Sequence, residues 1–401
     1  MNNQPRPIRI FFILLCSVAL FTGKVKAAED ISTDSITVSL LTCSPGQEVY
    51  EYYGHSALRI IDHSKGEDII FNYGLFSFNT PNFRWRFMRG DCQYEIGATF
   101  TLNFLAQYAD RGSFVREQIL NLHQSEARRL FQALIDNCQP QNRSYLYNFF
   151  YDNCATRIRD QIVRNLDGKL IYTQSVTDQS LRDIVHEYSQ SHPWSLFGQD
   201  LLLGAEADHQ ADRKSQQFAP LYLERDLSTA RIKAADGTER PLVSETRMLL
   251  PEMDPKPIEP CPVTPLVCAI ALLVVTAVIT GLELRMKKTC WIYDLVLLAS
   301  QGIVGLIISF MFFFSIHPTV GSNWLILLFN PLPLLFLYPV IQGERKGRKS
   351  IYYRVATVWL FLFLVGIPLI PQQFGPEIVL LTLTLLLRSA AHIYRTRRTI
   401  K

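Results

Sequence analysis

The last third of the chain consists mainly of apolar runs of membrane-spanning length, and this feature limits the possible fold more than any other. Each run is close to the ~20 residues that an α-helix needs to cross the hydrocarbon core of a bilayer. They occupy residues 263–282, 291–314, 324–341, 351–370 and 377–393. Because a lipid environment leaves backbone groups no partners but each other, such runs predict helices. We therefore expect an all-α domain of five transmembrane helices within residues 256–401.

The charges that flank these runs predict how the domain is oriented. Lys and Arg follow the first, third and fifth runs, whereas the connections at 315–323 and 371–376 contain neither. The positive-inside rule then places the C-terminus in the cytoplasm and the preceding residues outside. An N-terminal signal peptide over residues 1–27 agrees, because Arg6 and Arg9 precede a short apolar run and a small-residue cleavage site.

Composition argues against several classes of function. The formal charge is only +4 and clusters of Lys and Arg lie beside the apolar runs, so no nucleic-acid-binding surface is expected. No CxxC or HExxH spacing occurs, so we expect neither a metal nor another cofactor.

The exported region reads as an α+β domain with an antiparallel sheet. Strands are predicted at 36–41, 55–61, 68–73 and 92–97, and helices at 124–137 and 154–166, from their alternating and helical apolar patterns. We expect a core over residues 28–175. Residues 176–255 are expected to form an appendage and a Pro-rich linker to the first span.

The segment YNFFYDNCATRIRD, residues 147–160, places Cys154 at the start of a predicted helix. Unpaired N–H groups and the positive end of the helix dipole favour a thiolate there, which is the nucleophilic form of cysteine. Cys154 is therefore the candidate nucleophile. Its own backbone N–H is a candidate oxyanion donor.

A candidate base lies far upstream at the start of a predicted strand. His55 occurs in YYGHSALRI, and a third group should orient its ring. Asn72 on the next strand is our first candidate for that group, and Asp68 is the alternative. We assign Asp152 to capping of the Cys154 helix.

We assign substrate contacts to Arg157, Asn153 and Tyr53. Arg157 has two open interpretations, since its guanidinium can bind a phosphate head group or pair with a nearby acid such as Asp152. Arg159 is expected to pair with an acid.

Other cysteines and polar residues receive structural predictions. Cys43 and Cys92 are expected to pair as a disulfide, and the pairing of Cys138 and Cys261 stays open. Within or beside the apolar runs, Glu283 and His392 are expected to reach the membrane interface. His317 and Asn323, in an outer connection, are candidates for a lipid-access site.

The order of the two catalytic elements is the reverse of that in papain-like enzymes, because the histidine strand precedes the cysteine helix. This permuted order resembles NlpC/P60-like and lecithin:retinol-acyltransferase-like proteins. Those families use a Cys–His pair for amide cleavage or acyl transfer.

A closer resemblance covers nearly the whole chain and is carried by several sequence blocks in order. These blocks are LLTCSPG (40–46), YGHSALRI (53–60), FNYGLFSF (71–78), NRSYLYNFFYDNCATRIRD (142–160) and PWSLFGQDLLLG (193–204). They resemble the Lnb-type family, in which a periplasmic domain precedes five membrane spans. One departure is Ser77, where an Asp is common.

The resemblance implies a lipoprotein N-acyltransferase of the Gram-negative bacterial inner membrane, with a permuted papain-like thiol domain in the periplasm. Cys154 and His55 match the positions of nucleophile and base. The expected reaction is ping-pong: an acyl chain passes from a phospholipid to a Cys154 thioester and then to the terminal amine of a diacylated lipoprotein.

Two other classes of function stay open on the residues alone. One is a membrane-anchored thiol peptidase or amidase that acts on cell-wall peptide, which would use the same Cys–His pair. The other is a membrane assembly protein without enzymatic activity, in which Cys154 would lie in a disulfide.

Overall fold

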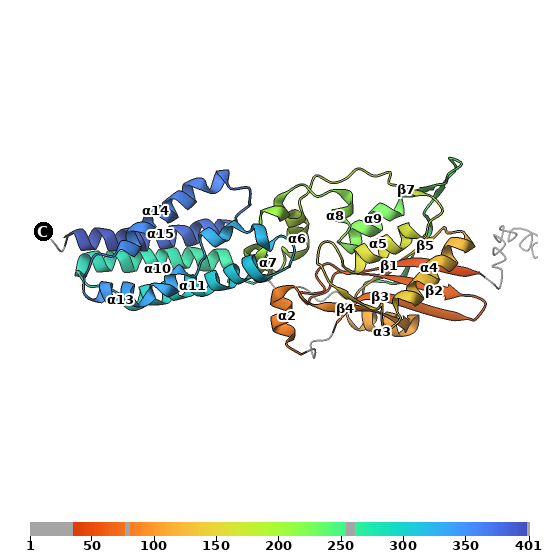
Figure 1. Cartoon of the computed structure of the whole chain (residues 1–401), viewed down its shortest axis with the longest axis horizontal. Coiled ribbons are helices and arrows are strands. Elements are labelled where there is room, and N and C mark those ends of the chain that lie inside the picture. Colours follow the sequence, from red (N-terminus) through yellow and green to blue (C-terminus); the bar gives the residue numbers. More distant parts are fainter. Residues whose placement is uncertain (1–34, 77–80, 254–260, 399–401) are drawn as a thin grey trace, which may run out of the picture.

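The computed structural model describes residues 35–76, 81–253 and 261–398. A sheet domain is followed by an elongated helical domain, with the C-terminus at the end of the helices away from the sheet (Figure 1). The predicted signal peptide lies outside the described residues. The predicted limits of the domains stay a prediction.

A single antiparallel sheet organises the first domain. It has seven strands in the order β10-β5-β1-β2-β3-β4-β6. The strands are β1 (Ile36–Cys43), β2 (His55–Asp62), β3 (Glu67–Leu75), β4 (Gln93–Phe100), β5 (Val115–Leu120), β6 (Ser144–Leu146) and β10 (Val243–Leu250). The four strands predicted from alternating patterns correspond to β1 to β4, so the α+β class is confirmed.

Helices cover both faces of this sheet because neighbouring strand residues point to opposite sides. On one face Leu40, Leu58 and Phe71 pack with residues of α4 (Gln124–Asn137), α5 (Cys154–Arg164) and α9 (Pro220–Ser228). On the other face Leu41 and Ile70 pack with Phe104 of α3 (Thr101–Asp110). The predicted helices at 124–137 and 154–166 are α4 and α5.

The stretch predicted to be an appendage contributes to the same core. Strand β10 pairs with β5 at the edge of the main sheet, and Leu223 and Leu227 of α9 are fully buried against it. The prediction was wrong here, because the turn-rich sequence between them suggested a separate unit. That sequence instead forms most of a small sheet, whose strands are β7 (Lys169–Ile171), β8 (Arg231–Lys233) and β9 (Glu239–Pro241).

Shorter helices lie between the two domains or beside them. They are α2 (Phe83–Arg89), α6 (Leu181–Ser189), α7 (Pro193–Leu202), the 3₁₀ turn η1 (Ala205–Asp208) and α8 (Arg213–Gln216). Figure 1 shows α2, α6 and α7 next to the end of the long helices that faces the sheet domain.

Four helices of the second domain are long and apolar enough to cross a membrane. They are α10 (Pro265–Met286), α11 (Trp291–Phe314), α14 (Ile351–Gly366), which is extended by η4 (Ile367–Leu369), and α15 (Pro376–Arg398).

The run predicted as the third of five spans is not one straight helix. It follows η2 (Val320–Ser322) and consists of η3 (Trp324–Leu327), α12 (Leu332–Leu335) and α13 (Leu337–Arg345), with a bend of 68°. Side chains of other helices satisfy two of its carbonyls: Gln301 Nε2 donates to Leu328 O at 3.0 Å and Trp359 Nε1 to Leu327 O at 2.6 Å. Counted as one broken span, it gives the predicted five.

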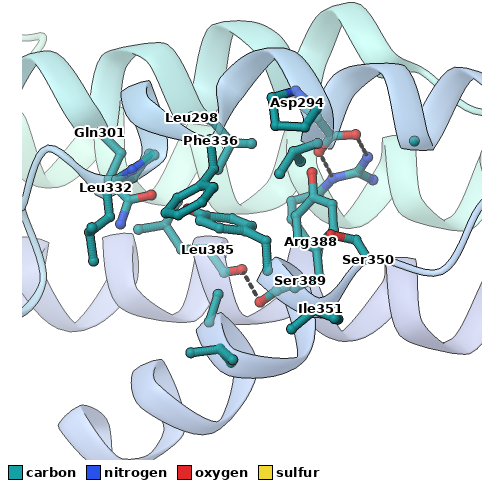
Figure 2. Close-up of a pocket in the computed structure, with 18 of the residues that line it drawn as sticks. Asp294, Leu298, Gln301, Leu332, Phe336, Ser350, Ile351, Leu385, Arg388 and Ser389 are labelled. Atoms are coloured by element: carbon teal, nitrogen blue, oxygen red, sulfur yellow. Dashed lines mark hydrogen bonds and ion pairs between the residues drawn. The ribbon is translucent and has the colours of Figure 1, made fainter.

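Two ionisable residues of the helical domain are placed differently from the prediction. Glu283 and His392 do not extend to the interface but are buried between helices. Glu283 Oε2 pairs with Arg388 at 2.8 Å. Arg388 also pairs with Asp294, and Figure 2 shows this second ion pair. His392 Nδ1 contacts Glu344 Oε1 at 3.1 Å. The reason is that each group has an opposite or hydrogen-bonding partner on a neighbouring helix, which sequence position alone does not reveal.

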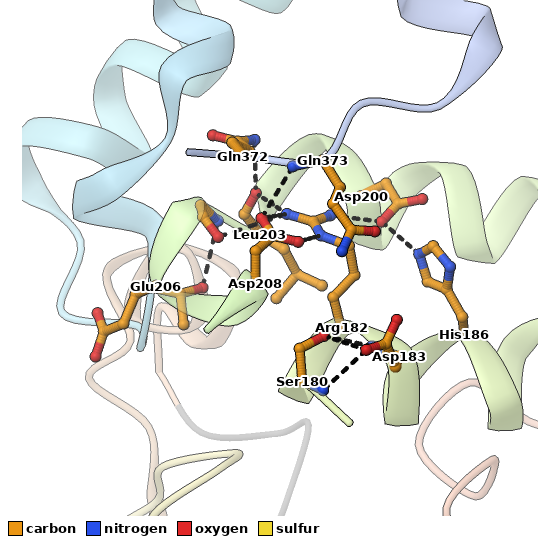
Figure 3. Close-up of polar contacts among 12 residues, drawn as sticks. Ser180, Arg182, Asp183, His186, Asp200, Leu203, Glu206, Asp208, Gln372 and Gln373 are labelled. Atoms are coloured by element: carbon orange, nitrogen blue, oxygen red, sulfur yellow. Dashed lines mark hydrogen bonds and ion pairs between the residues drawn. The ribbon is translucent and has the colours of Figure 1, made fainter. Parts of the chain in front are cut away.

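Polar contacts centred on α7 and η1 join the two domains. Buried Arg182 of α6 donates to Asp200 Oδ1 and Asp208 Oδ1, both at 2.6 Å, and Asp208 Oδ2 accepts from the Gln373 backbone N–H at 3.2 Å (Figure 3). Gln372 Nε2 donates to Leu203 O at 3.1 Å. The helical domain is thus bonded directly to the end of α7.

The outer connections of the helical domain take part in the same junction. Asn323 Nδ2 donates to Leu201 O at 2.8 Å, and His317 Nε2 donates to Phe87 O of α2 at 2.6 Å. A Cβ on Gly204 would lie 2.2 Å from Thr319 O. The backbones at Gly204 and Thr319 are therefore so close that only glycine fits at position 204. His317 and Asn323 therefore hold the domains together, and lipid access through them stays a prediction.

Candidate active site

Cys154 is the first residue of α5, where the sequence placed it. Asn153 caps this helix, and its side-chain oxygen accepts from Thr156 N at 3.0 Å. An ideal Cβ on Gly74 would lie 3.8 Å from Cβ of Cys154, so the helix begins directly against the end of β3. Helix α5 is fixed in this position by Ile158 and Ile162, which are fully buried in the sheet core.

The surroundings of Cys154 favour its ionised form. Burial by itself raises the pKa of the thiol, but the charge of His55 and a hydrogen bond from it act in the opposite direction. The backbone N–H groups of Ser56 and Ala155 also donate to the sulfur. The net result is a pKa of Cys154 below the ordinary thiol value, which is the condition for a reactive cysteine.

His55 lies at the start of β2 and contacts both Cys154 and Asn72. Its Nε2–H donates to Asn72 Oδ1 at 2.8 Å, which leaves Nδ1 as the ring nitrogen for the sulfur. Burial lowers the pKa of His55, but the negative charge on Cys154 and the hydrogen bonds to Cys154 and Asn72 outweigh it, so the pKa is raised. The two shifts point to an imidazolium–thiolate pair.

The backbone just before His55 requires a glycine. Gly54 has a φ of +75°, and a Cβ there would lie 2.5 Å from the carbonyl oxygen of Cys43. In the sheet, Cys43 of β1 is the register partner of His55. The close approach at Gly54 therefore determines where β2 begins and hence where the imidazole lies.

Two acidic residues considered for this site have other partners. Asp68, the alternative to Asn72, binds Arg59 Nε at 2.8 Å and accepts from Thr101 Oγ1 at 2.6 Å. The residue that caps α5 is Asn153, not Asp152, so the predicted cap was wrong by one residue. Its carboxylate accepts from Arg157 Nε and Nη2 at 2.6 and 2.7 Å instead.

The residues assigned to substrate contacts all have internal partners. The Arg157 guanidinium pairs with Asp152, which is the second of the two interpretations given for it. It also lies 3.6 Å from the ring centroid of Tyr145. Asn153 Nδ2 donates to Phe149 O and Phe218 O at 2.9 Å each. The Tyr53 hydroxyl donates to Gln199 Oε1 at 2.8 Å. Substrate binding by these three residues stays a prediction.

Arg159 is paired, as expected for a structural residue. Its guanidinium contacts Asp160 Oδ1 at 2.8 Å and donates to Lys214 O at 2.7 Å. These bonds connect α5 to α8.

The predicted disulfide between Cys43 and Cys92 is not present, and all cysteines of the described residues are free thiols. Cys43 packs with Leu41 and Phe104 on one face of the sheet, whereas Cys92 packs in the core on the opposite face. The sheet therefore separates the two sulfurs. This arrangement could not be deduced from spacing in the sequence.

The sequence missed one contributor to the site, the backbone N–H of Ser56. It approaches the Cys154 sulfur together with the N–H of Ala155. The available signal was its position directly after His55, on a strand expected to face the cysteine helix. Among the described residues no group of three or more His, Cys, Asp or Glu side chains is arranged to hold a metal ion.

Comparison with known families matches both parts of the chain. Residues 24–187 match the Lnb N-terminal periplasmic domain, and residues 258–399 match the Lnb transmembrane domain. The chain belongs to the Lnb family. As an Lnb protein it has a periplasmic domain that precedes membrane-spanning helices, and it is an acyltransferase-like membrane protein of the lipoprotein N-acyltransferase type. Neither the curated proteins nor the solved structures contain a match to this Lnb chain.

Proposed function

We propose that this protein is a lipoprotein N-acyltransferase that moves a fatty acyl chain from a phospholipid to the terminal α-amine of diacylated lipoproteins. The observation that supports it most is the contact of Cys154 with His55, itself bonded to Asn72, in a domain that is joined to apolar helices. The acyl donor and the acceptor are both membrane lipids or lipid-anchored, which accounts for the attachment of a thiol domain to several spans.

In the first step the Cys154 thiolate attacks the carbonyl carbon of a phospholipid acyl ester. The tetrahedral oxyanion that forms is stabilised by nearby backbone N–H groups, for which those of Ser56 and Ala155 are candidates. The attack forms the C–S bond, and collapse of the intermediate breaks the C–O bond while the His55 imidazolium gives its proton to the departing lysophospholipid oxygen.

In the second step the lipoprotein amine attacks the thioester carbonyl. An α-amine has a pKa of about 8, so the attacking form is the neutral fraction present near pH 7. The one proton that this neutral amine loses on becoming an amide passes to the neutral His55 imidazole. The attack forms the C–N bond, and collapse of the intermediate breaks the C–S bond and releases Cys154 as a thiolate. The starting imidazolium–thiolate pair is thereby restored, so the cycle needs no external acid or base.

Water must be kept from the thioester for the amine to compete. Cys154 and His55 are both partly buried, and Tyr145 and Tyr147 lie close enough to Cys154 for its charge to help raise the pKa of their hydroxyls. Docking of the periplasmic domain on the helical domain, through α7, further limits access of water from the membrane side.

The orientation proposed for the helical domain is C-terminus in the cytoplasm, in the bacterial inner membrane. Its support is the alternation of Lys- and Arg-rich connections with connections that contain neither. A reporter active only in the periplasm, fused after the C-terminus, should be inactive. An active reporter would reverse the proposed topology.

A trapping experiment tests the reaction. Purified full-length protein is mixed with a phospholipid that carries a labelled acyl chain, and the label on the protein is located by peptide mass spectrometry. We expect a hydroxylamine-labile acyl group on Cys154 that transfers to an added diacylated lipopeptide. Cys154→Ala should abolish it, and Cys138→Ala, which alters another partly buried thiol away from the site, should not.

Each alternative gives a different result in this experiment. A peptidase or amidase would release peptide fragments from cell-wall peptide and leave no acyl chain on Cys154. A protein without enzymatic activity would show neither product, and full transfer by Cys154→Ala would reject the proposed mechanism.

A further inference from the structure

The helical domain contains a cavity that the proposed reaction does not use. It has a volume of about 940 Å³ and lies at the end of the bundle away from the sheet domain. Its walls come from α11, α12, α13, α14 and α15, as the side chains in Figure 2 show. Helix α14 packs mainly on α15, which leaves the space between α13 and α14 for the cavity.

Much of the wall is apolar, and part of it faces outward while the rest belongs to the packed interior of the bundle. The cavity is lined by Phe336, which directly precedes α13, and by Val355 and Trp359 of α14. These three residues are 48%, 62% and 45% exposed, respectively. In a bilayer such a wall contacts hydrocarbon. A cavity of this size between spans therefore accommodates acyl chains.

The rim at the far end of the cavity is basic. Lys346, Arg348 and Lys349 line it, and none of the three makes an ion pair with any residue that the structure describes. By contrast Arg388, deeper in the wall, has its charge neutralised by Asp294 and Glu283. The unbalanced positive charge thus lies only at the rim, next to the level where lipid head groups lie.

We infer that this cavity is a binding site for an anionic phospholipid. Its acyl chains lie along Val355 and Trp359, and its head-group phosphate meets Lys346, Arg348 and Lys349. An apolar cavity with a cationic rim between spans matches an amphiphile with a negative head. The site is at the opposite end of the bundle from the domain that carries Cys154, so it is separate from the proposed acyl donor site and does not rest on the proposed function (Figure 1).

Native mass spectrometry of the full-length protein tests this inference. The protein is purified in a neutral detergent and titrated with phosphatidylglycerol or with zwitterionic phosphatidylcholine. We expect the first bound phosphatidylglycerol to be retained preferentially, and K346Q/R348Q/K349Q to weaken it by more than tenfold, since each cation near a head group contributes about fivefold. The matched control K287Q/K288Q removes two cations that do not line the cavity and should leave this preference intact.

A second variant tests the cavity without changing charge. Ala356 lines it, so Ala356→Trp should fill it and displace the retained lipid, whereas Ala277→Trp, on an exposed position of α10, should not. Inorganic phosphate should not compete with the lipid. Equal retention of both lipids by the wild-type protein, or retention unchanged in both the triple variant and Ala356→Trp, would overturn the inference.

Discussion

At the scale of single residues, the site depends on the charge that His55 and Cys154 share. The pKa of Cys154 is lowered, mainly by His55 acting against burial, and the pKa of His55 is raised, mainly by Cys154 acting against burial. Both shifts favour the ionised form of each group. The pair therefore carries a thiolate at pH values where an ordinary cysteine is a thiol.

This charge state predicts the pH dependence of alkylation. The rate at Cys154 with iodoacetamide should rise at a lower pH than the rate at Cys138, whose pKa is raised by burial. In His55→Ala the midpoint at Cys154 should move up by about one pH unit or more, because the opposite charge is lost. Peptide mass spectrometry across a pH series measures both thiols in one sample. A midpoint unchanged in His55→Ala would contradict the pairing.

Asn72 should act as a positioning residue through His55. In Asn72→Ala the imidazole of His55 loses its hydrogen-bond partner at 2.8 Å, and we expect the rate of acyl transfer to fall roughly tenfold. This loss is smaller than the about 10²- to 10⁴-fold that removal of a whole acid–base group costs. The alkylation midpoint of Cys154 should rise at the same time, because that hydrogen bond supports the imidazolium. A purely structural role would lower the yield of folded protein but leave the midpoint in place. Asn72→Gln should restore part of the activity.

The sequence predicted three candidate residues that the structure brings together, but not how their neighbours pair. Cys154, His55 and Asn72 could be found because each occupies a distinctive place on a helix start or a strand. The choice between Asp152 and a phosphate as the partner of Arg157 depends on side-chain directions in the folded loop, which no pattern encodes. The separation of Cys43 from Cys92 likewise depends on which face of the sheet each one occupies.

At the scale of elements, the sequence was most informative where patterns are long. Strands β1 to β4 and helix α4 were predicted because their apolar residues repeat with a clear period. Strand β10 was missed because it is an edge strand whose side chains are mostly exposed, so it carries no buried stripe. The bend before α13 was missed because a span is recognised by its mean apolar composition, in which the prolines Pro331, Pro333 and Pro339 around the break carry little weight.

The start of β2 gives a prediction about stability. Gly54→Ala should lower the melting temperature more than Gly66→Ala, since both positions have a positive φ, of +75° and +66°, but only Gly54 faces a carbonyl at 2.5 Å. The backbone conformation alone costs about 1–2 kcal/mol for a residue with a Cβ. Thermal unfolding of the two variants measures the difference. Equal melting temperatures would show that Gly54 is not under steric constraint.

At the scale of the whole molecule, the relation between the two domains is fixed at α7 and η1. Arg182 and Asp208 hold the end of α7, and Gln372 connects it to the helical domain. The sequence block at 193–204 was recognised, but its role as a joint was not, because its partners lie more than a hundred residues away.

Loss of this joint should reduce lipid transfer without altering the thiol. Gln372→Met removes the bonds to Leu203 O and Trp324 N, so we expect acylation of Cys154 from a bilayer to fall while its alkylation by iodoacetamide is unchanged. The control is Gln373→Ala, since Gln373 contacts Asp208 only through its backbone N–H. Parallel acylation and alkylation assays on proteoliposomes compare the two. Equal acylation by both variants would show that the joint does not position the domain.

The bent third span has a consequence for how the chain is made. Its carbonyl at Leu328 accepts from Gln301, on a helix synthesised before it, and its carbonyl at Leu327 accepts from Trp359, on a helix synthesised after it. Within the segment itself, Asn330 Nδ2 supplies a longer bond of 3.5 Å to Leu327 O. Released alone into hydrocarbon, the segment would expose backbone groups that lipid cannot satisfy. We therefore expect this segment to reach its final bent form only once α14 has emerged, because Trp359 of that later helix supplies the shorter bond to Leu327 O.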